Sequence, residues 1–159
     1  MSDEVTITAA TVADVSAVVD LIGRVYAEYG FVWEARTEVP DLFAFETHYA
    51  APRGAFFVAH AAGRTVGSVG VERVDDRGAE LHRLYVEESC RGRGAGRALI
   101  ERVLAWCHEQ RMARLILWSD TRFKAAHRLY ERMGFRRCGE RELVGDVNQT
   151  REYGFEREV

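Results

Sequence analysis

The feature that most constrains the fold is a glycine-rich turn between a strand-like and a helix-like segment. The turn is Arg91–Gly96, and the apolar segment Leu81–Val86 precedes it. A strand–turn–helix unit points backbone N–H groups and a helix N-terminus at one place, which attracts an anion such as phosphate. Glycine allows a close backbone approach at that place. The helix is predicted from apolar residues at helical spacing, namely Ala98, Leu99, Ile100, Val103, Leu104 and Cys107.

The spacing of the glycines and charged residues in this turn indicates which classes of phosphate-containing ligand it could bind. A kinase-like P-loop ends in Gly-Lys-Ser/Thr, which is absent here. A dinucleotide fingerprint needs a third glycine where Arg97 stands. Arg91, Arg93 and Arg97 can add charge-assisted hydrogen bonds to phosphate oxygens. The competing interpretation is a tight turn without a ligand.

The order of elements along the chain predicts a mixed α/β domain with three antiparallel strands before the turn. Thr11–Asp14 is a candidate capping box for a helix that runs to about Tyr29. Residues 31–39 have no periodicity, and a second helix is predicted from Pro40 to about Tyr49. The expected strands are 5–9, 55–61, 66–74, 79–86, 114–118, 135–144 and 149–158, and the later helices are 96–110 and 122–133.

The charge is unevenly distributed along the 159 residues, a length that suits one domain. Residues 83–141 carry a net charge of +7, whereas residues 1–82 carry −7 and residues 142–159 carry −3. A basic centre suits a small polyanion; nucleic acid is the less favoured partner, since no basic arm or aromatic RNA-binding strand is present. The N-terminus Met1–Glu4 has no apolar leader, no apolar run could span a membrane, and three widely spaced cysteines indicate reduced thiols. We therefore expect a cytoplasmic protein.

Two motifs in the right order resemble the GNAT superfamily of N-acetyltransferases. The first is Arg-x-x-Gly-x-Gly at Arg91, Gly94 and Gly96, and the second is Leu-Tyr-x-x-x-Gly-Phe over residues 129–135. The resemblance implies that residues 1–159 form a single GNAT acetyltransferase domain. Its α/β (α+β) fold would have a mixed central sheet of about seven strands and about four helices. That sheet would be splayed near the strand that precedes the glycine-rich turn.

The resemblance also implies a function. The chain would move an acetyl group from acetyl-CoA to a primary amine, either a small amine, an amino acid or a protein amine, in one ternary complex. No metal would take part, and the protein would be a monomer or homodimer. The alternatives are a non-catalytic acyl-CoA-binding or sensing module and an interaction protein with a polyanion-binding patch. Backbone groups of Leu84, Tyr85 and Val86 would hold the pantetheine arm, and the pyrophosphate would be held by Arg91, Gly92, Arg93, Gly94, Ala95, Gly96 and Arg97.

Two candidate catalytic residues follow from the same resemblance. Tyr130 would protonate the departing thiolate, although its spacing from Phe123, Ala126 and Met133 also fits a core residue. Glu80 would accept the proton of the ammonium form of the acceptor, directly or through water, because a carboxylate on a half-buried strand can have a raised pKa. His82 on the same strand face or a bound water could serve as the base instead, and Glu80 could be only a solvated charge.

Three further positions carry expectations. Phe123 stands where the family often has an asparagine that contacts coenzyme A, so that hydrogen bond is lost. The five histidines show no metal-ligand spacing, and Cys90 is interpreted as a buried or idle thiol in preference to a nucleophile. Residues 28–48 are rich in acidic and aromatic side chains, which suits either a cationic acceptor or a solvated acidic face.

Overall fold

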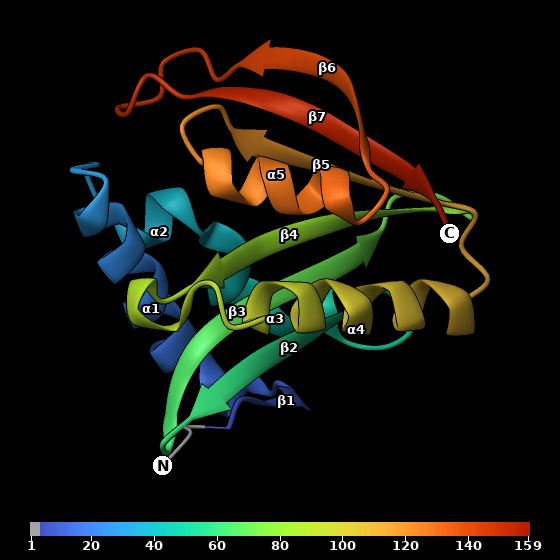
Figure 1. Cartoon of the computed structure of the whole chain (residues 1–159), viewed down its shortest axis with the longest axis horizontal. Helices are drawn as coiled ribbons and strands as arrows, with labels where there is room; N and C mark the ends of the chain where they lie inside the picture. The colour runs from blue at the N-terminus through green and yellow to red at the C-terminus, as the bar shows by residue number, and fades with distance from the viewer. Residues whose placement is uncertain (1–3) are drawn as a thin grey trace.

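The computed structural model describes residues 4–159 and contains one sheet in which the strand order is β1-β2-β3-β4-β5-β7-β6 (Figure 1). Neighbouring strands are antiparallel except β4 and β5, which are parallel. The acidic segment Met1–Asp3, used above to judge the N-terminus, lies outside the described residues. The strands are β1 (Thr6–Ala9), β2 (Gly54–Ala61), β3 (Arg64–Arg73), β4 (Gly78–Val86), β5 (Arg114–Asp120), β6 (Arg136–Glu142) and β7 (Arg151–Glu158).

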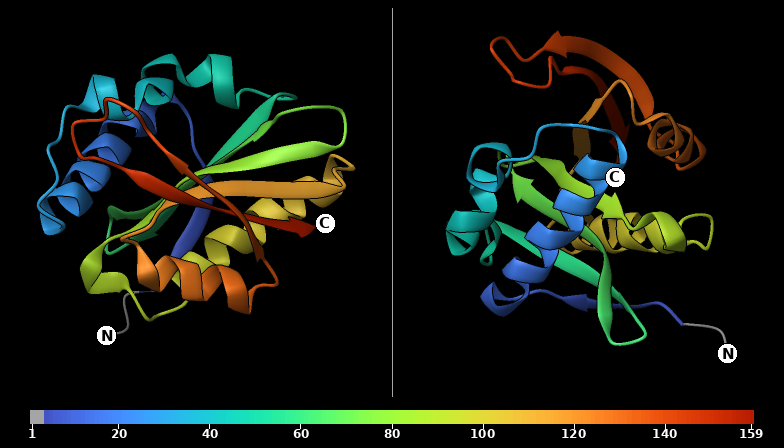
Figure 2. Two further views of the ribbon diagram at one scale, coloured as in Figure 1. Left: turned by 90° about the horizontal axis from the view of Figure 1, so that it is seen from above. Right: turned by 90° about the vertical axis from the view of Figure 1, so that its left-hand side faces the viewer.

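Helices cover both faces of the sheet (Figures 1 and 2). One face carries α1 (Val15–Glu28), α2 (Ala35–Glu38) and α3 (Phe45–Tyr49), and the other carries α4 (Ala95–Glu109) and α5 (Lys124–Arg132). Three short 3-10 turns join them: η1 (Val12–Asp14), η2 (Pro40–Ala44) and η3 (Glu88–Cys90). Within residues 4–159, no helix combines the length and apolar character needed to cross a membrane.

Each face of the sheet has its own apolar core. Leu99, Ile100 and Val103 of α4 are fully buried against β2, β3 and β4. On the opposite face, Val18 and Ile22 of α1 pack with the side chains of η2, α3 and β2. The helical periodicity of α1 and α4 therefore reflects one buried stripe on each helix.

The expected mixed seven-stranded sheet is confirmed, and the helices differ in number and position. The described residues form five α-helices where about four were expected. The helix predicted from Pro40 to Tyr49 is divided, because Ala44 has a non-helical backbone (φ −131°, ψ 43°) between η2 and α3. The segment 31–39, expected to be irregular, includes the one-turn helix α2. Such short helices are stabilised by packing more than by local propensity, so periodicity detects them poorly. The Thr11 capping box is present and caps η1.

The sheet opens along the junction between β4 and β5. The two strands are paired only from Gly78–Leu81 to Arg114–Leu117, although β4 continues to Val86 and β5 to Asp120. A bulge in β4 lies just after the opening, where Arg83 has a positive φ of 55° and the pairing register with β3 shifts. The Ser68 hydroxyl donates a hydrogen bond of 2.8 Å to the Arg83 carbonyl and so holds this bulge. The splay expected near the strand before the glycine-rich turn is thus observed.

Candidate active site

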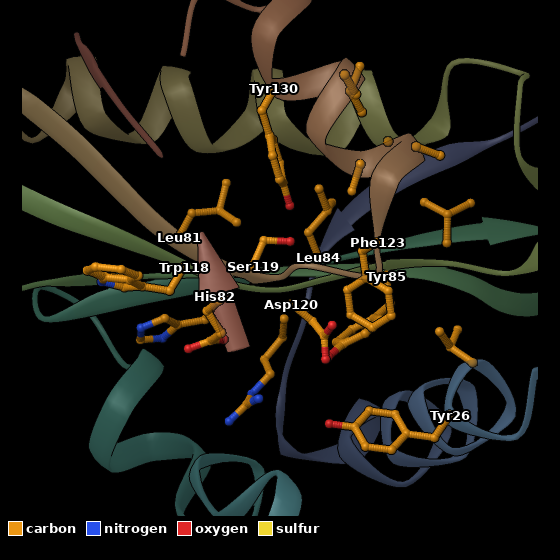
Figure 3. Close-up of a pocket in the computed structure, with 18 of the residues that line it drawn as sticks. Tyr26, Leu81, His82, Leu84, Tyr85, Trp118, Ser119, Asp120, Phe123 and Tyr130 are labelled. Atoms are coloured by element: carbon orange, nitrogen blue, oxygen red, sulfur yellow. The ribbon is translucent and has the colours of Figure 1, made fainter. Parts of the chain in front are cut away.

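A cavity of about 1120 Å³ occupies the opening between β4 and β5. Its walls come from the end of β4, the glycine-rich turn, the end of β5 and one face of α5. The side walls come from α1, the segment from α2 through η2 to α3, and the loop between β6 and β7. Figure 3 shows Tyr130 entering from the α5 side, with His82 and Trp118 at one end and Tyr26, Tyr85 and Phe123 at the other.

The glycine-rich turn forms a backbone cradle at one end of this cavity. Gly92 and Gly94 have φ angles of 76° and 85°, and Gly94 is the N-cap of α4. A Cβ atom added at either glycine would meet no atom within 4 Å, so the space beside both residues is open. The first N–H groups of α4 lack intrahelical acceptors and lie beside this space. The geometry therefore suits an anionic group of a bound ligand.

The three arginines of the turn differ in their surroundings. The Arg91 guanidinium donates to the Val86 carbonyl (Nε–O 3.0 Å) and forms an ion pair with Glu28 (Nη2–Oε1 2.8 Å). Arg91 thus ties the turn to β4 and α1. Arg97 lines the cavity and lies 3.0 Å from Glu101 (Nε–Oε1) on the next turn of α4. Arg93 is exposed and lies outside the cavity lining within the described residues.

The other residues predicted for ligand binding all lie along the cavity. Leu84, Tyr85 and Val86 contribute the part of β4 that is no longer paired with β5. Ala95 and Gly96 follow at the start of α4. A ligand that enters between β4 and β5 would meet backbone groups free of the neighbouring strand. This arrangement fits a long, narrow ligand with an anionic end at the glycine-rich turn.

Tyr130 reaches the middle of the cavity from α5 and is 3% exposed. Its ring is held by Phe135 and Phe155, with ring centroids at 5.8 and 5.4 Å. Burial raises the pKa of Tyr130 well above its ordinary value, so the hydroxyl stays protonated at neutral pH. Tyr130 therefore packs as a core aromatic and also presents a proton donor to the cavity.

Glu80 and His82 project from β4 on the same wall, as the alternation of the strand predicts. Oε1 of Glu80 lies 3.5 Å from Nε2 of His82. The hydrogen bond from His82 is the main cause that lowers the pKa of Glu80, so this carboxyl is ionised at neutral pH. Glu80 is only partly exposed, and its lowered pKa is opposite to the raised pKa expected for a half-buried strand carboxylate.

A partly buried ion pair forms the floor beside His82. Arg83 Nη2 donates to Oδ1 of Asp41 at 2.6 Å, and the Tyr49 hydroxyl donates to Oδ2 of the same carboxylate at 2.5 Å. The Tyr49 oxygen is also 3.3 Å from Nδ1 of His82. Burial would raise the pKa of Asp41, but the hydrogen bonds and charge of Arg83 outweigh this and lower it. Sequence analysis missed this network, because Asp41 lies 42 residues from Arg83.

Phe123 joins an aromatic group at the far end of the cavity. Its ring centroid lies 4.9 Å from that of Tyr29 and 6.2 Å from that of Tyr85. The position thus provides an apolar surface where the family often has an amide. Nearby, Glu38 accepts from the Tyr26 hydroxyl at 3.4 Å through Oε2, while its buried Oε1 has no hydrogen-bond partner among the described residues.

Cys90 and the candidate metal ligands are the remaining positions with a sequence-based expectation. Cys90 is buried in the cavity wall, and its Sγ is 3.8 Å from Oε2 of Glu87. In the part of the chain that the structure describes, no group of three or more His, Cys, Asp or Glu residues is placed to hold a metal ion.

Comparison with known proteins bears directly on this cavity. The sequence profile of the Acetyltransferase (GNAT) family matches residues 22–135, which is more than half of the chain. The match runs from α1 through the glycine-rich turn to the end of the Leu-Tyr-x-x-x-Gly-Phe motif. The chain belongs to the GNAT family of acetyltransferases.

Two relatives of this GNAT protein show how far the sequence similarity extends. An uncharacterized N-acetyltransferase of Mycobacterium tuberculosis is 32% identical over 115 residues, covering 72% of this chain and 74% of the relative. An N-acetylaspartate synthetase of Danio rerio is 38% identical over 104 residues, covering 64% of this chain. This chain spans only 37% of the length of that synthetase.

Solved structures confirm the GNAT fold. An acetyltransferase of the GNAT family from Staphylococcus aureus superposes with a TM-score of 0.85 at 22% identity, covering 98% of this chain and 99% of the other. An acetyltransferase from Salmonella typhimurium, solved with its cofactor acetyl-CoA, has a TM-score of 0.76 at 20% identity and coverages of 97% and 93%. The expected family and fold are confirmed, and the names of these relatives support an enzyme of the N-acetyltransferase class.

Proposed function

We propose that this protein is an acetyl-CoA-dependent N-acetyltransferase that moves an acetyl group to a primary amine by direct transfer in a ternary complex. The observation that carries the proposal is one cavity that joins the glycine-rich turn, the free end of β4, Tyr130 and Glu80. Family membership supports acetyl-CoA as the co-substrate.

The coenzyme would lie along β4 with its pyrophosphate at the glycine-rich turn. Open space beside Gly92 and Gly94, together with the N-terminus of α4, suits two phosphate groups. Backbone N–H and C=O groups of Leu84, Tyr85 and Val86 would hold the pantetheine arm. Arg91 and Arg97 would add positive charge, with Arg91 acting partly by holding the turn through Glu28. The exposed Arg93 would contribute only long-range attraction.

Tyr130 would act as the general acid. Its buried hydroxyl keeps its proton at neutral pH and faces the middle of the cavity. When the C–S bond breaks, the proton would pass from the tyrosine oxygen to the thiolate sulfur. Burial disfavours the free thiolate as well as the tyrosinate, so a proton donor beside the sulfur keeps the leaving group from departing as an unprotonated anion.

Glu80 would act as the base, with His82 beside it. The acceptor arrives as ammonium and must lose a proton before its nitrogen attacks the acetyl carbonyl carbon. Glu80 is ionised at neutral pH and can take that proton, directly or through water. The hydrogen bond to His82 orients the carboxylate. The ammonium would lose one proton to the base before attack, and the nitrogen would lose a second to solvent as the C–S bond breaks and the amide forms. The tyrosine proton would go to sulfur, the tyrosine oxygen would regain a proton from solvent, and the base would release its proton, so one proton is released per turnover.

The cavity wall on the acceptor side favours a cationic amine. Its two arginines are already paired, Arg83 with Asp41 at 2.6 Å and Arg141 with Glu152 at 2.8 Å. Because both positive charges are already neutralised, this wall offers little attraction to an acidic acceptor. Asp41 and Glu152 belong to these pairs, and Glu72 pairs with Arg53, so among the described residues the carboxylates of this wall outside an ion pair with arginine are Glu38, Glu80 and Asp146.

A turnover screen tests the proposal. Acetyl-CoA consumption and product mass would be followed with neutral amines, diamines, basic and acidic amino acids, and peptides. We expect acetylated product from cationic acceptors. Acetyl-CoA binding without any product would support the acyl-CoA-binding module, and absence of binding would refute both.

A further inference from the structure

Two loops that are far apart in the sequence meet at the rim of the cavity. One is the segment 29–34 between α1 and α2, and the other is the segment 143–150 between β6 and β7. Both contribute residues to the cavity lining. Figure 1 shows the β6–β7 loop at the same end of the molecule as α1 and α2. The proposed reaction does not require these two loops to touch.

The Asn148 side chain joins the two loops. Its Oδ1 accepts a hydrogen bond of 2.8 Å from the backbone N–H of Val32, and its Nδ2 donates a hydrogen bond of 3.0 Å to the Val32 carbonyl. The directions are fixed, because a backbone N–H can only donate and a carbonyl can only accept. Asn148 therefore pairs with the backbone of a residue 116 positions away, much as a neighbouring strand would. We call this pair of hydrogen bonds the Asn148 clasp.

Each loop is also held by contacts of its own. In the β6–β7 loop, Oδ2 of Asp146 accepts hydrogen bonds from the backbone N–H groups of Asn148 and Thr150, each at 3.1 Å, and from the Thr150 hydroxyl at 2.5 Å. In the α1–α2 loop, the Phe31 ring lies 6.1 Å from that of Phe123 between centroids. Loss of the clasp would therefore separate the loops and leave the structure within each loop in place.

The clasp closes the rim of the cavity between the two loops. A small amine can lie wholly inside this cavity of about 1120 Å³. A polypeptide acceptor extends beyond the residue that carries the reacting amine, so its chain must cross the rim while the amine is bound. A polypeptide therefore needs a wider opening than a small amine does.

The strength of the clasp sets how often the rim opens. Both hydrogen bonds are exposed to solvent, so water can replace them. Two neutral hydrogen bonds of ordinary net strength correspond to about 5- to 150-fold in the equilibrium between a closed and an open rim. The open form is then a minor population, and an acceptor that requires it binds more weakly by the same factor.

We propose that the Asn148 clasp makes this protein selective for small amines over amines that belong to a polypeptide. The inference rests on the proposed function, because it concerns the acceptor of the same reaction and names the class of amine. Asn148 acts here as a specificity-determining residue. It takes no part in bond breaking or proton transfer, and it acts by limiting which acceptors can reach Tyr130 and Glu80.

A comparison of acceptors in wild type and Asn148→Ala tests the proposal. We would measure kcat/KM for the small amine that turns over best. The same constant would be measured for short peptides that carry a free N-terminus or a single lysine. We expect wild type to favour the small amine by about 5-fold or more. In Asn148→Ala, the ratio of peptide to small-amine kcat/KM should rise by about 5- to 150-fold, because the rim no longer has to be opened.

Val147→Ala is the matched control. Val147 lies in the same loop, is 59% exposed and is outside the cavity lining within the described residues. This variant should leave the ratio unchanged. Amide hydrogen exchange gives a readout apart from activity: the Val32 N–H should be protected in wild type and in Val147→Ala, and should lose that protection in Asn148→Ala.

The outcomes distinguish this inference from the proposed function. A ratio that Asn148→Ala leaves unchanged, or a wild-type protein that acetylates peptides as efficiently as small amines, would overturn the clasp as a selectivity determinant and leave the acetyltransferase proposal standing. A wild-type protein that acetylates no amine would overturn both. Should Asn148→Ala fail to fold, Asn148→Asp gives the same comparison with a smaller rise, because an ionised carboxylate still accepts from the Val32 N–H but cannot donate to its carbonyl.

Discussion

The glycine-rich turn gives the most specific prediction. A methyl group added at Gly94 should both strain the backbone and weaken ligand binding, and a control variant separates the two effects. Gly94→Ala places a Cβ on a residue with φ 85°. A non-glycine residue in this left-handed region costs about 1–2 kcal/mol. For a domain of this size the loss lowers the melting temperature by about 2–8 °C. No steric clash adds to it, because the new atom would meet nothing within 4 Å.

The same open space is where the proposed pyrophosphate lies, so the methyl group would keep phosphate oxygens from the N–H groups of the turn. The loss of one hydrogen bond to a charged group is about 1.5–3 kcal/mol. Acetyl-CoA affinity should therefore fall by about 10- to 150-fold. Isothermal titration calorimetry on the folded variant measures this.

Gly63→Ala is the matched control. Gly63 lies in the turn between β2 and β3, outside the cavity lining, with φ 75° and open space around its added Cβ. It should lose a similar amount of stability and no acetyl-CoA affinity. If the two variants bind acetyl-CoA equally well, the turn is not the pyrophosphate site.

Three other predictions concern the cavity. Tyr130→Phe should keep acetyl-CoA binding and lower kcat by about 10²- to 10⁴-fold, and full activity at saturating substrate would make Tyr130 a core residue only. The hydrogen bond from His82 lowers the pKa of Glu80, so the wild-type kcat/KM should fall only at pH values below the ordinary range of a glutamate. Glu80→Gln should lower kcat/KM most at neutral pH and less at high pH. If the pH profiles of wild type and variant superimpose, Glu80 is not the base. Asp41→Asn should lower the free energy of unfolding in urea by about 2–3 kcal/mol, because it leaves Arg83 without its carboxylate partner. The pKa of Asp41 is lowered in the folded protein, so its stabilisation is complete above the unfolded pKa, about 4, and is lost as the pH falls toward the folded pKa. The difference from wild type should therefore shrink below about pH 4, and a pH-independent difference would contradict this.

The parts of the site that sequence could predict are those built from local backbone chemistry. The glycines of the turn mark positive φ angles and a helix start within a few residues, which leaves a readable pattern at Gly92 and Gly94. The motif around Tyr130 is likewise confined to one helix and the turn after it. Alternation along β4 correctly placed Glu80 beside His82.

The parts that sequence could not predict depend on pairing between distant segments. Nothing in the sequence shows that Asp41 would lie beneath Arg83, or that Arg91 would pair with Glu28, 63 residues away. The bulge at Arg83 is also hidden, because a positive φ at arginine has no sequence signal comparable to glycine. Val32 and Asn148 are likewise 116 positions apart, so their pairing leaves no pattern along the chain.

The narrow junction between β4 and β5 has a mechanical consequence. Among residues 4–159, four residue pairs form the only ladder that joins strands β1 to β4 to strands β5, β7 and β6. The two halves of the sheet are therefore joined by hydrogen bonds at one end of β4 and β5 and are separate at the other end. A molecule that forms hydrogen bonds with the unpaired part of β4 and packs against β5 and α5 would hold the two halves of the sheet at a fixed angle. If the co-substrate binds as proposed, it would connect the two halves of the sheet before the reaction begins.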